Sequence, residues 1–157
     1  MDFIFGGSAL NKGANLVTVG IPREFGYVVL VAAASAIMII WMGIQVGKAR
    51  KKFKITYPTM YAPSDTKEGD HFNCYQRAHQ NTLEGYPTFL FLLFLGGLEM
   101  PVFSALAGVV FILGRISYAR GYYTGDPKNR LRGMYAMIGV LALLIATLKF
   151  GIRLICM

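Results

Sequence analysis

The stretch GYVVLVAAASAIMIIWMGIQV, residues 26–46, carries no charged side chain from one end to the other. About 20 consecutive apolar residues in an α-helix are enough to cross the hydrocarbon core of a bilayer. A run of this length and composition is typical of a transmembrane helix. The stretch therefore predicts a membrane protein.

Three further runs have the length of a membrane span: residues 77–98, 102–123 and 133–152. The first of these begins with polar residues, the second contains Arg115, and the third is apolar up to Lys149, whose long side chain can reach the interface. Together the four runs predict an all-α, polytopic membrane protein built as a four-transmembrane-helix bundle. Its domains are expected to be an N-terminal extension (1–24), one membrane domain (25–153) and a C-terminal tail (154–157).

The composition agrees with this fold class. Of the 157 residues, 55% are hydrophobic and only 15% are charged, whereas charged residues make up roughly a quarter of an average soluble domain. The alternative is a soluble protein with four buried helices. It is disfavoured because four segments this apolar leave too little polar surface to face water.

The net charge of +8 would suggest nucleic-acid binding in a soluble protein. Here the basic residues lie beside the apolar runs, in KARKKFK (48–54) and at Lys128, Arg130 and Arg132, so nucleic acid is not an expected partner. With four spans these two connections share one side of the membrane. The positive-inside rule then predicts that both face the cytosol and both termini face away from it.

Polar side chains lie inside two of the apolar runs at helical spacing. Arg77, Asn81 and Glu84 are at positions i, i+4 and i+7, which places them on one helix face. The third run carries a second such stripe, which consists of Arg115, Tyr118 and Tyr122. Ionisable residues at membrane depth cost several kcal/mol unless they are paired or hydrated, and they mark a functional site by default.

The excess of arginine over glutamate in this region predicts an anionic ligand. A guanidinium binds carboxylates through two parallel hydrogen bonds, and the lone Glu84 suggests that the ligand also carries an amine. Two alternatives remain open: a purely structural network in which Arg77 or Arg115 neutralises Glu84, and a channel or transporter for anions.

Other polar features predict no chemistry. Cys74 and Cys156 give neither a disulfide framework nor ligand spacing for a metal, and His71 and His79 have no further ligands nearby. No metal site is therefore expected. The turn-rich stretch YPTMYAPSDTKEGDHF (57–72) is interpreted as an exposed loop without a role in chemistry.

Two long strings, RAHQNTLE (77–84) and GRISYARGYYTGDPKNRLRG (114–133), resemble the membrane-associated glutathione and eicosanoid enzymes of the MAPEG family. The resemblance runs from about residue 24 to residue 151. It implies a homotrimer of four-helix subunits with a glutathione site between neighbouring subunits.

The resemblance also implies roles for individual residues. The catalytic pair would be Arg130, which holds the glutathione sulfur as a thiolate, and Tyr118, with Arg132 as the alternative to Arg130 because the preceding loop is longer by one residue than in a family member. Arg50 would come from the adjacent subunit, Lys51 stands where a family member has arginine, and His79 stands where one has glutamine. The full set implied to bind glutathione is Arg50, Lys51, Arg77, His79, Asn81, Glu84, Arg115, Tyr118 and Tyr122.

The function implied is a membrane glutathione transferase and peroxidase. Its thiolate would attack lipophilic electrophiles, either epoxides of the leukotriene A4 type, giving leukotriene C4, or lipid hydroperoxides. The alternative is a non-catalytic lipid-binding scaffold, as in the five-lipoxygenase-activating member of the family. Expected partners are glutathione as co-substrate, the lipid electrophile, membrane lipid and further copies of the chain. The expected location is the endoplasmic reticulum, with the mitochondrial outer membrane as the alternative and the site facing the cytosol.

Overall fold

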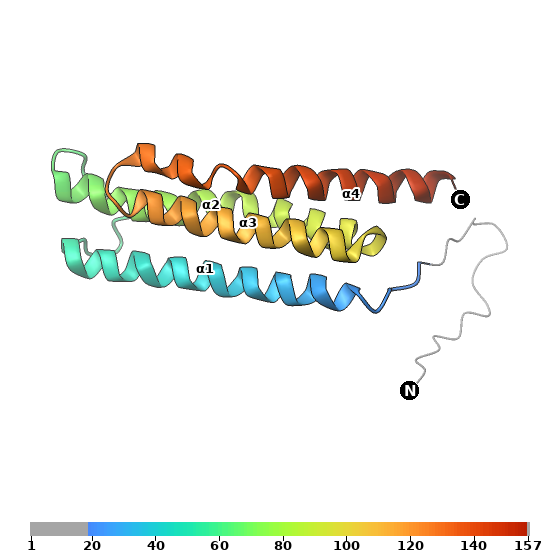
Figure 1. The fold of residues 1–157 in the computed structure, drawn as a ribbon. Helices are drawn as coiled ribbons and strands as arrows, with labels where there is room; N and C mark the ends of the chain where they lie inside the picture. The colour runs from blue at the N-terminus through green and yellow to red at the C-terminus, as the bar shows by residue number, and fades with distance from the viewer. Residues whose placement is uncertain (1–18, 157) are drawn as a thin grey trace, which may run out of the picture.

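The computed structural model describes residues 19–156, and within them every regular element is a helix. The elements are α1 (Phe25–Phe53), α2 (Lys67–Glu99), α3 (Pro101–Tyr122), a 3₁₀ helix η1 (Pro127–Gly133) and α4 (Ala136–Cys156). Figure 1 shows the four α-helices lying lengthwise side by side. The all-α class is thereby confirmed. Residues 1–18 of the predicted extension and residue 157 of the predicted tail lie outside the described residues.

α1, α3 and α4 are long and apolar enough to cross a membrane. The predicted second span, 77–98, is not among the candidate spans of the described chain. α2 has 33 residues, but Arg77, Glu84 and their polar neighbours occupy its middle, so its uninterrupted apolar stretch is short. Length and composition therefore support three of the four predicted spans.

Many large apolar side chains of these helices point away from the protein interior. On α1, Ile37, Ile40 and Ile44 are exposed, and α4 exposes Ile138 and Ile145 in the same way. A water-soluble protein seldom exposes continuous apolar faces of this kind. These faces are suited to contact with lipid chains, which agrees with an integral membrane protein.

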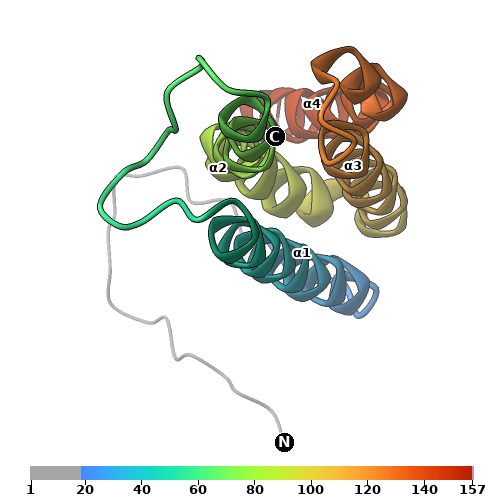
Figure 2. The same ribbon diagram turned by 90° about the vertical axis from the view of Figure 1, so that its left-hand side faces the viewer.

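α2 and α3 form the centre of the fold. Both pack against each other and against α1 and α4, and the end-on view in Figure 2 shows α1 and α4 on opposite sides of this pair. The rings of Phe89 on α2 and Phe111 on α3 stack with their centroids 4.0 Å apart. Gly108 on α3 allows close contact, because a Cβ there would lie 2.7 Å from Val31 of α1.

The two basic connections lie at the same end of the fold. Figure 1 shows the carboxyl end of α1, the start of α2 and η1 together at one end, and the start of α1 and the end of α4 at the other. α1 ends where Lys54 takes a left-handed conformation with φ of 55°. α2 begins at Lys67, where the Thr66 side chain accepts a hydrogen bond from Gly69 N at 3.0 Å. The stretch 57–72, predicted to be an exposed loop, is therefore non-helical over residues 57–66, whereas its last six residues, 67–72, belong to α2.

Candidate functional site

The polar stripe of α2 is joined by its own side chains. Arg77 Nη1 lies 3.4 Å from Glu84 Oε1, and Asn81 Nδ2 donates to Glu84 Oε2, also at 3.4 Å. The side chains of Arg77 and Glu84 are 48% and 49% exposed, so this ion pair is accessible to a ligand. An ion pair this open contributes little to stability by itself.

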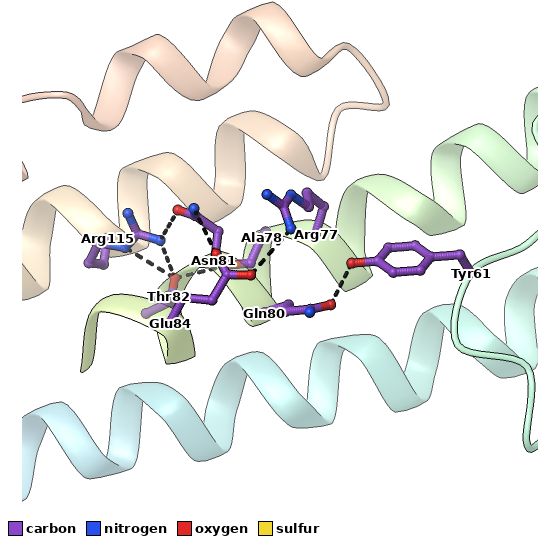
Figure 3. Close-up of polar contacts among 8 residues, drawn as sticks. All are labelled: Tyr61, Arg77, Ala78, Gln80, Asn81, Thr82, Glu84 and Arg115. Atoms are coloured by element: carbon purple, nitrogen blue, oxygen red, sulfur yellow. Dashed lines mark hydrogen bonds and ion pairs between the residues drawn. The ribbon is translucent and has the colours of Figure 1, made fainter. Parts of the chain in front are cut away.

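Arg115 of α3 is fixed to α2 by three hydrogen bonds (Figure 3). Its Nε donates to Thr82 Oγ1 at 3.0 Å, and its Nη2 donates to Thr82 Oγ1 at 2.5 Å and to Asn81 Oδ1 at 3.0 Å. The guanidinium carbon also lies 4.2 Å from the ring centroid of Tyr118, a cation–π distance. Arg115 is thus held between Thr82 and Tyr118 and does not neutralise Glu84, which pairs with Arg77.

The tyrosines of α3 continue this polar surface toward η1. The rings of Tyr118 and Tyr122 meet edge to face with centroids 5.1 Å apart. Arg130 Nη1 donates to the Tyr122 hydroxyl at 3.3 Å. Arg130 and the nearby Arg132 are both exposed, but the described contacts of Tyr122 include Arg130 and not Arg132.

η1 packs against α3 because glycines stand at the points of contact. A Cβ on Gly121 would meet the backbone of Asn129, and a Cβ on Gly133 would meet the backbone of Gly114 and Tyr118. Any larger side chain at these two positions would push η1 away from α3. The two glycines therefore bring Arg130 to Tyr122.

We give the name α2–α3 cluster to seven of the residues that these contacts join: Arg77, Asn81, Glu84, Arg115, Tyr118, Tyr122 and Arg130. It holds three guanidiniums and one carboxylate. Such a surface favours a ligand with more than one negative charge, because each guanidinium can bind a carboxylate through two hydrogen bonds.

A cavity of about 380 Å³ adjoins the cluster and is lined by Arg77 and Tyr122 together with Asp70, Asn73 and Cys74. Burial raises the pKa of the Cys74 thiol, and the nearby carboxylates of Asp70 and Asp126 raise it further. The Cys74 thiol also lies 3.7 Å from the carbonyl oxygen of Gly125. Cys74 is therefore a protonated, weakly nucleophilic thiol.

Three residues of the predicted set lie apart from the cluster within one chain. Arg50 Nη1 donates to Thr59 O at 2.6 Å, and Lys51 lines a cavity of about 650 Å³ with Arg50 at the end of α1. His79 faces α1, because a Cβ on Gly43 would lie 3.8 Å from its ring. In the part of the chain that the structure describes, none of these three side chains hydrogen-bonds to the cluster.

Sequence reasoning missed two polar contacts beside the cluster. Thr82 is 1% exposed and accepts from Arg115 while its hydroxyl donates to Ala78 O at 2.9 Å. Tyr61 donates its hydroxyl to Gln80 Oε1 at 2.5 Å. Thr82 lies off the face shared by Arg77 and Glu84, so helical spacing did not single it out. The Tyr61 contact crosses 19 residues, so no helical spacing predicts it.

The described residues include no group of three or more His, Cys, Asp or Glu side chains placed to hold a metal ion. The cluster itself offers guanidinium, phenol, amide and carboxylate groups. Such groups can bind an anion, orient it and stabilise a developing negative charge.

Comparison with known proteins gives one consistent result. The MAPEG family pattern matches residues 28–152. The chain is 36% identical over 131 residues to microsomal glutathione S-transferase 2 of Bos taurus, covering 81% of this chain and 85% of that protein. It is 36% identical over 123 residues to the protein of the same name in Homo sapiens, covering 78% and 79%. It is 29% identical over 130 residues to leukotriene C4 synthase of Bos taurus, covering 82% of each.

Proposed function

Because this chain belongs to the MAPEG family, we propose that it is a membrane glutathione transferase that activates glutathione as a thiolate. The names of its relatives, microsomal glutathione S-transferase and leukotriene C4 synthase, support this activity class. Within the family, RAHQNTLE and YARGYYTG resemble microsomal glutathione S-transferase 3 more than leukotriene C4 synthase. The observation that carries the proposal is the joining of the α2 and α3 stripes and Arg130 into one cationic cluster.

The charges of the cluster fit glutathione, which has two carboxylates and one ammonium. Arg77 and Arg115 would hold carboxylates, and Glu84 would take the ammonium. Asn81, Tyr118 and Tyr122 offer further hydrogen bonds to the peptide backbone. Arg115 is already fixed by Thr82 and Asn81, so binding does not have to order it, which favours affinity.

Arg130 and Tyr118 are the proposed catalytic residues. A free thiol has a pKa of about 8.5 and is only a few per cent thiolate at neutral pH. A guanidinium beside the sulfur favours the anion, and a pKa depression of roughly two units corresponds to about 2.7 kcal/mol. Arg130 is proposed over Arg132 because it already reaches Tyr122 at 3.3 Å.

The proposed assembly is a homotrimer of subunits with four membrane spans. In it, Arg50 would be contributed by the adjacent subunit, which would account for its distance from the cluster within one chain. The cavity at Arg50 and Lys51 lies at the end of α1, on the same end of the fold as the cluster. This arrangement would allow one subunit to complete the site of its neighbour.

The proposed electrophiles are lipophilic and arrive through the bilayer. Epoxides of the leukotriene A4 type would give leukotriene C4, and reduction of lipid hydroperoxides would be the peroxidase reaction. Holding both reactants at the interface removes much of the entropic cost of their encounter. The proposed location is the endoplasmic reticulum, or alternatively the mitochondrial outer membrane, with the site toward the cytosol and a role in lipid metabolism.

The alternative is a non-catalytic lipid-binding scaffold, as in the five-lipoxygenase-activating member of the family. A scaffold has no need to place a guanidinium where a thiolate would form. The contact between Arg130 and Tyr122 beside Tyr118 favours the enzyme.

The test uses purified full-length protein in detergent micelles. Glutathione binding is measured by calorimetry, the bound thiolate by its ultraviolet absorbance, and turnover with a lipophilic epoxide and a hydroperoxide. We expect Arg130→Ala to keep most of the affinity for glutathione and to lose the thiolate band and turnover. Arg132→Ala is the matched control and should retain both. The reverse pattern would assign the thiolate to Arg132, and absence of glutathione binding by the wild type would favour the scaffold.

A further inference from the structure

A short loop beside the cluster is held to the helices at both of its ends. Arg50 Nη1 donates to Thr59 O at 2.6 Å. At the other end, the Asn73 amide makes two hydrogen bonds of 2.8 Å with the backbone of Ala62, one to its N–H and one to its carbonyl. Ala62 is itself buried against Phe72. We call residues 59–62 the anchored loop.

The anchored loop presents Tyr61 to the helix that carries the polar stripe. Tyr61 donates its hydroxyl to Gln80 Oε1 at 2.5 Å, and Figure 3 shows the tyrosine reaching Gln80 from outside the helices. Because the segment is fixed on either side of Tyr61, its phenol has a defined position rather than that of a free surface side chain.

Gln80 and Asn81 lie on opposite sides of the line that joins Arg77 and Glu84. At 100° per residue, positions 77 and 84 nearly coincide, whereas 80 and 81 fall to either side of them. Asn81 accepts from Arg115 of α3, so α3 forms one flank of the stripe. The pair of Gln80 and Tyr61 forms the other flank.

We propose that Tyr61 is a glutathione-binding residue that forms this second flank of the site, with Asn73 as the residue that positions it. The inference rests on the proposed function. It also gives a binding role to a residue of the stretch 57–72, for which the sequence predicted no role in chemistry. A peptide lying along Arg77 and Glu84 would meet the Tyr61 ring and hydroxyl on the side opposite Arg115. Because the phenol is already held in place, it loses little conformational entropy when glutathione binds. Little of the free energy of its contact with glutathione is therefore spent on ordering the side chain.

A purely structural role is the competing explanation. In that case the hydrogen bond between Tyr61 and Gln80 only ties the loop to α2, and its removal changes stability and not ligand affinity. The two roles are separated by measuring both quantities on the same variants.

The test is Tyr61→Phe in the full-length protein in detergent, titrated with glutathione. Loss of one ordinary hydrogen bond to the ligand predicts a Kd for glutathione raised roughly two- to tenfold, with the loss in KM for glutathione rather than in kcat. The melting temperature should fall no further than in Tyr135→Phe, which also loses one side-chain hydrogen bond. Asn73→Ala, which releases the loop, should raise the Kd in the same direction.

Tyr135→Phe is the matched control. Tyr61 and Tyr135 are 39% and 38% exposed, and the Tyr135 hydroxyl also has one side-chain partner, Ser117 Oγ at 2.7 Å. It should bind glutathione as the wild type does. The inference is overturned, while the proposed function stands, by a Tyr61→Phe variant that binds glutathione normally or that loses affinity only together with a fall in melting temperature larger than that of Tyr135→Phe. A wild type that binds no glutathione would overturn both.

Discussion

Thr82 is the residue whose replacement tests the geometry of the cluster most directly. Thr82→Val keeps the size and the β-branched shape of the side chain but removes the oxygen that accepts two hydrogen bonds from Arg115. The guanidinium would retain its bond to Asn81 Oδ1 at 3.0 Å and its position over the Tyr118 ring. Because Thr82 is 1% exposed, water cannot readily replace the lost acceptor.

The expected cost follows from the hydrogen bonds that disappear. A hydrogen bond to a charged group contributes about 1.5–3 kcal/mol, against about 0.5–1.5 kcal/mol for a neutral one. Because both bonds share one acceptor oxygen, they are counted as one charged hydrogen bond, and Thr82→Val should lower the free energy of unfolding by about 1.5–3 kcal/mol. Arg115 would then be held only by Asn81 and by its position over the Tyr118 ring, so glutathione affinity should fall together with stability.

The assay is thermal unfolding in detergent micelles, with glutathione titration on the same samples. Thr147→Val is the control, because the Thr147 hydroxyl donates to Leu143 O at 2.9 Å, as Thr82 does to Ala78 O, and its described bonds do not include a guanidinium. We expect the control to lose only about 0.5–1.5 kcal/mol and to bind glutathione normally. Equal effects of the two substitutions would show that Thr82 does not hold Arg115.

Three further outcomes follow from contacts described above. Gly133→Ala should destabilise the protein by about 1–3 kcal/mol, because its Cβ would meet backbone atoms of α3. Gly151→Ala, which lies within α4 and has open space, should instead raise the melting temperature slightly, because alanine favours a helix more than glycine does. A hydrogen bond from Arg153 and the charges of Arg153 and Lys149, both on α4, lower the pKa of Glu99 below its ordinary value of 4.5. In melting experiments at a series of pH values, the wild type should therefore be more stable than Glu99→Gln above pH 4.5. This difference in stability should disappear as the pH falls through the lowered pKa. N-Ethylmaleimide should label the exposed Cys156 well before the buried Cys74, whose raised pKa leaves it protonated at neutral pH, as mass spectrometry of the peptides would show.

Hydropathy located the parts of the helices that meet lipid, but not their ends in water. α1 was predicted to end at residue 46 and continues to Phe53, because KARKKFK can remain helical once it has left the bilayer. α2 begins at Lys67 with a Thr66 cap and acidic residues in its first turn, signals that depend on local chemistry and not on apolar length. The same polar half makes α2 fall short of a clear membrane span.

Periodicity predicted the contents of each stripe but not the contacts between stripes. Arg77, Asn81 and Glu84 share a face because one helix repeats every 3.6 residues. Whether Arg77 or Arg115 would neutralise Glu84 was left open, since that depends on how α3 is rotated against α2. In the structure Arg77 forms the ion pair with Glu84, while Arg115 donates its hydrogen bonds to Thr82 and Asn81.

Contacts made by the loop were beyond such reasoning. The sequence around Tyr61 gives no sign that the Asn73 amide hydrogen-bonds the backbone N–H and the backbone carbonyl of Ala62. The closure of a loop on a helix depends on tertiary position, which neither hydropathy nor helical spacing encodes.

The two-bond contact of Asn73 with Ala62 has a practical consequence for labelling. The Asn73 amide hydrogen-bonds both backbone groups of Ala62, much as a neighbouring strand would. The residues that follow Ala62 are therefore not needed to orient Tyr61. Extra residues inserted between Ser64 and Asp65, both exposed, should therefore leave the tyrosine where it is. That point offers a place for a fluorophore or an epitope at the rim of the cavity that adjoins the cluster.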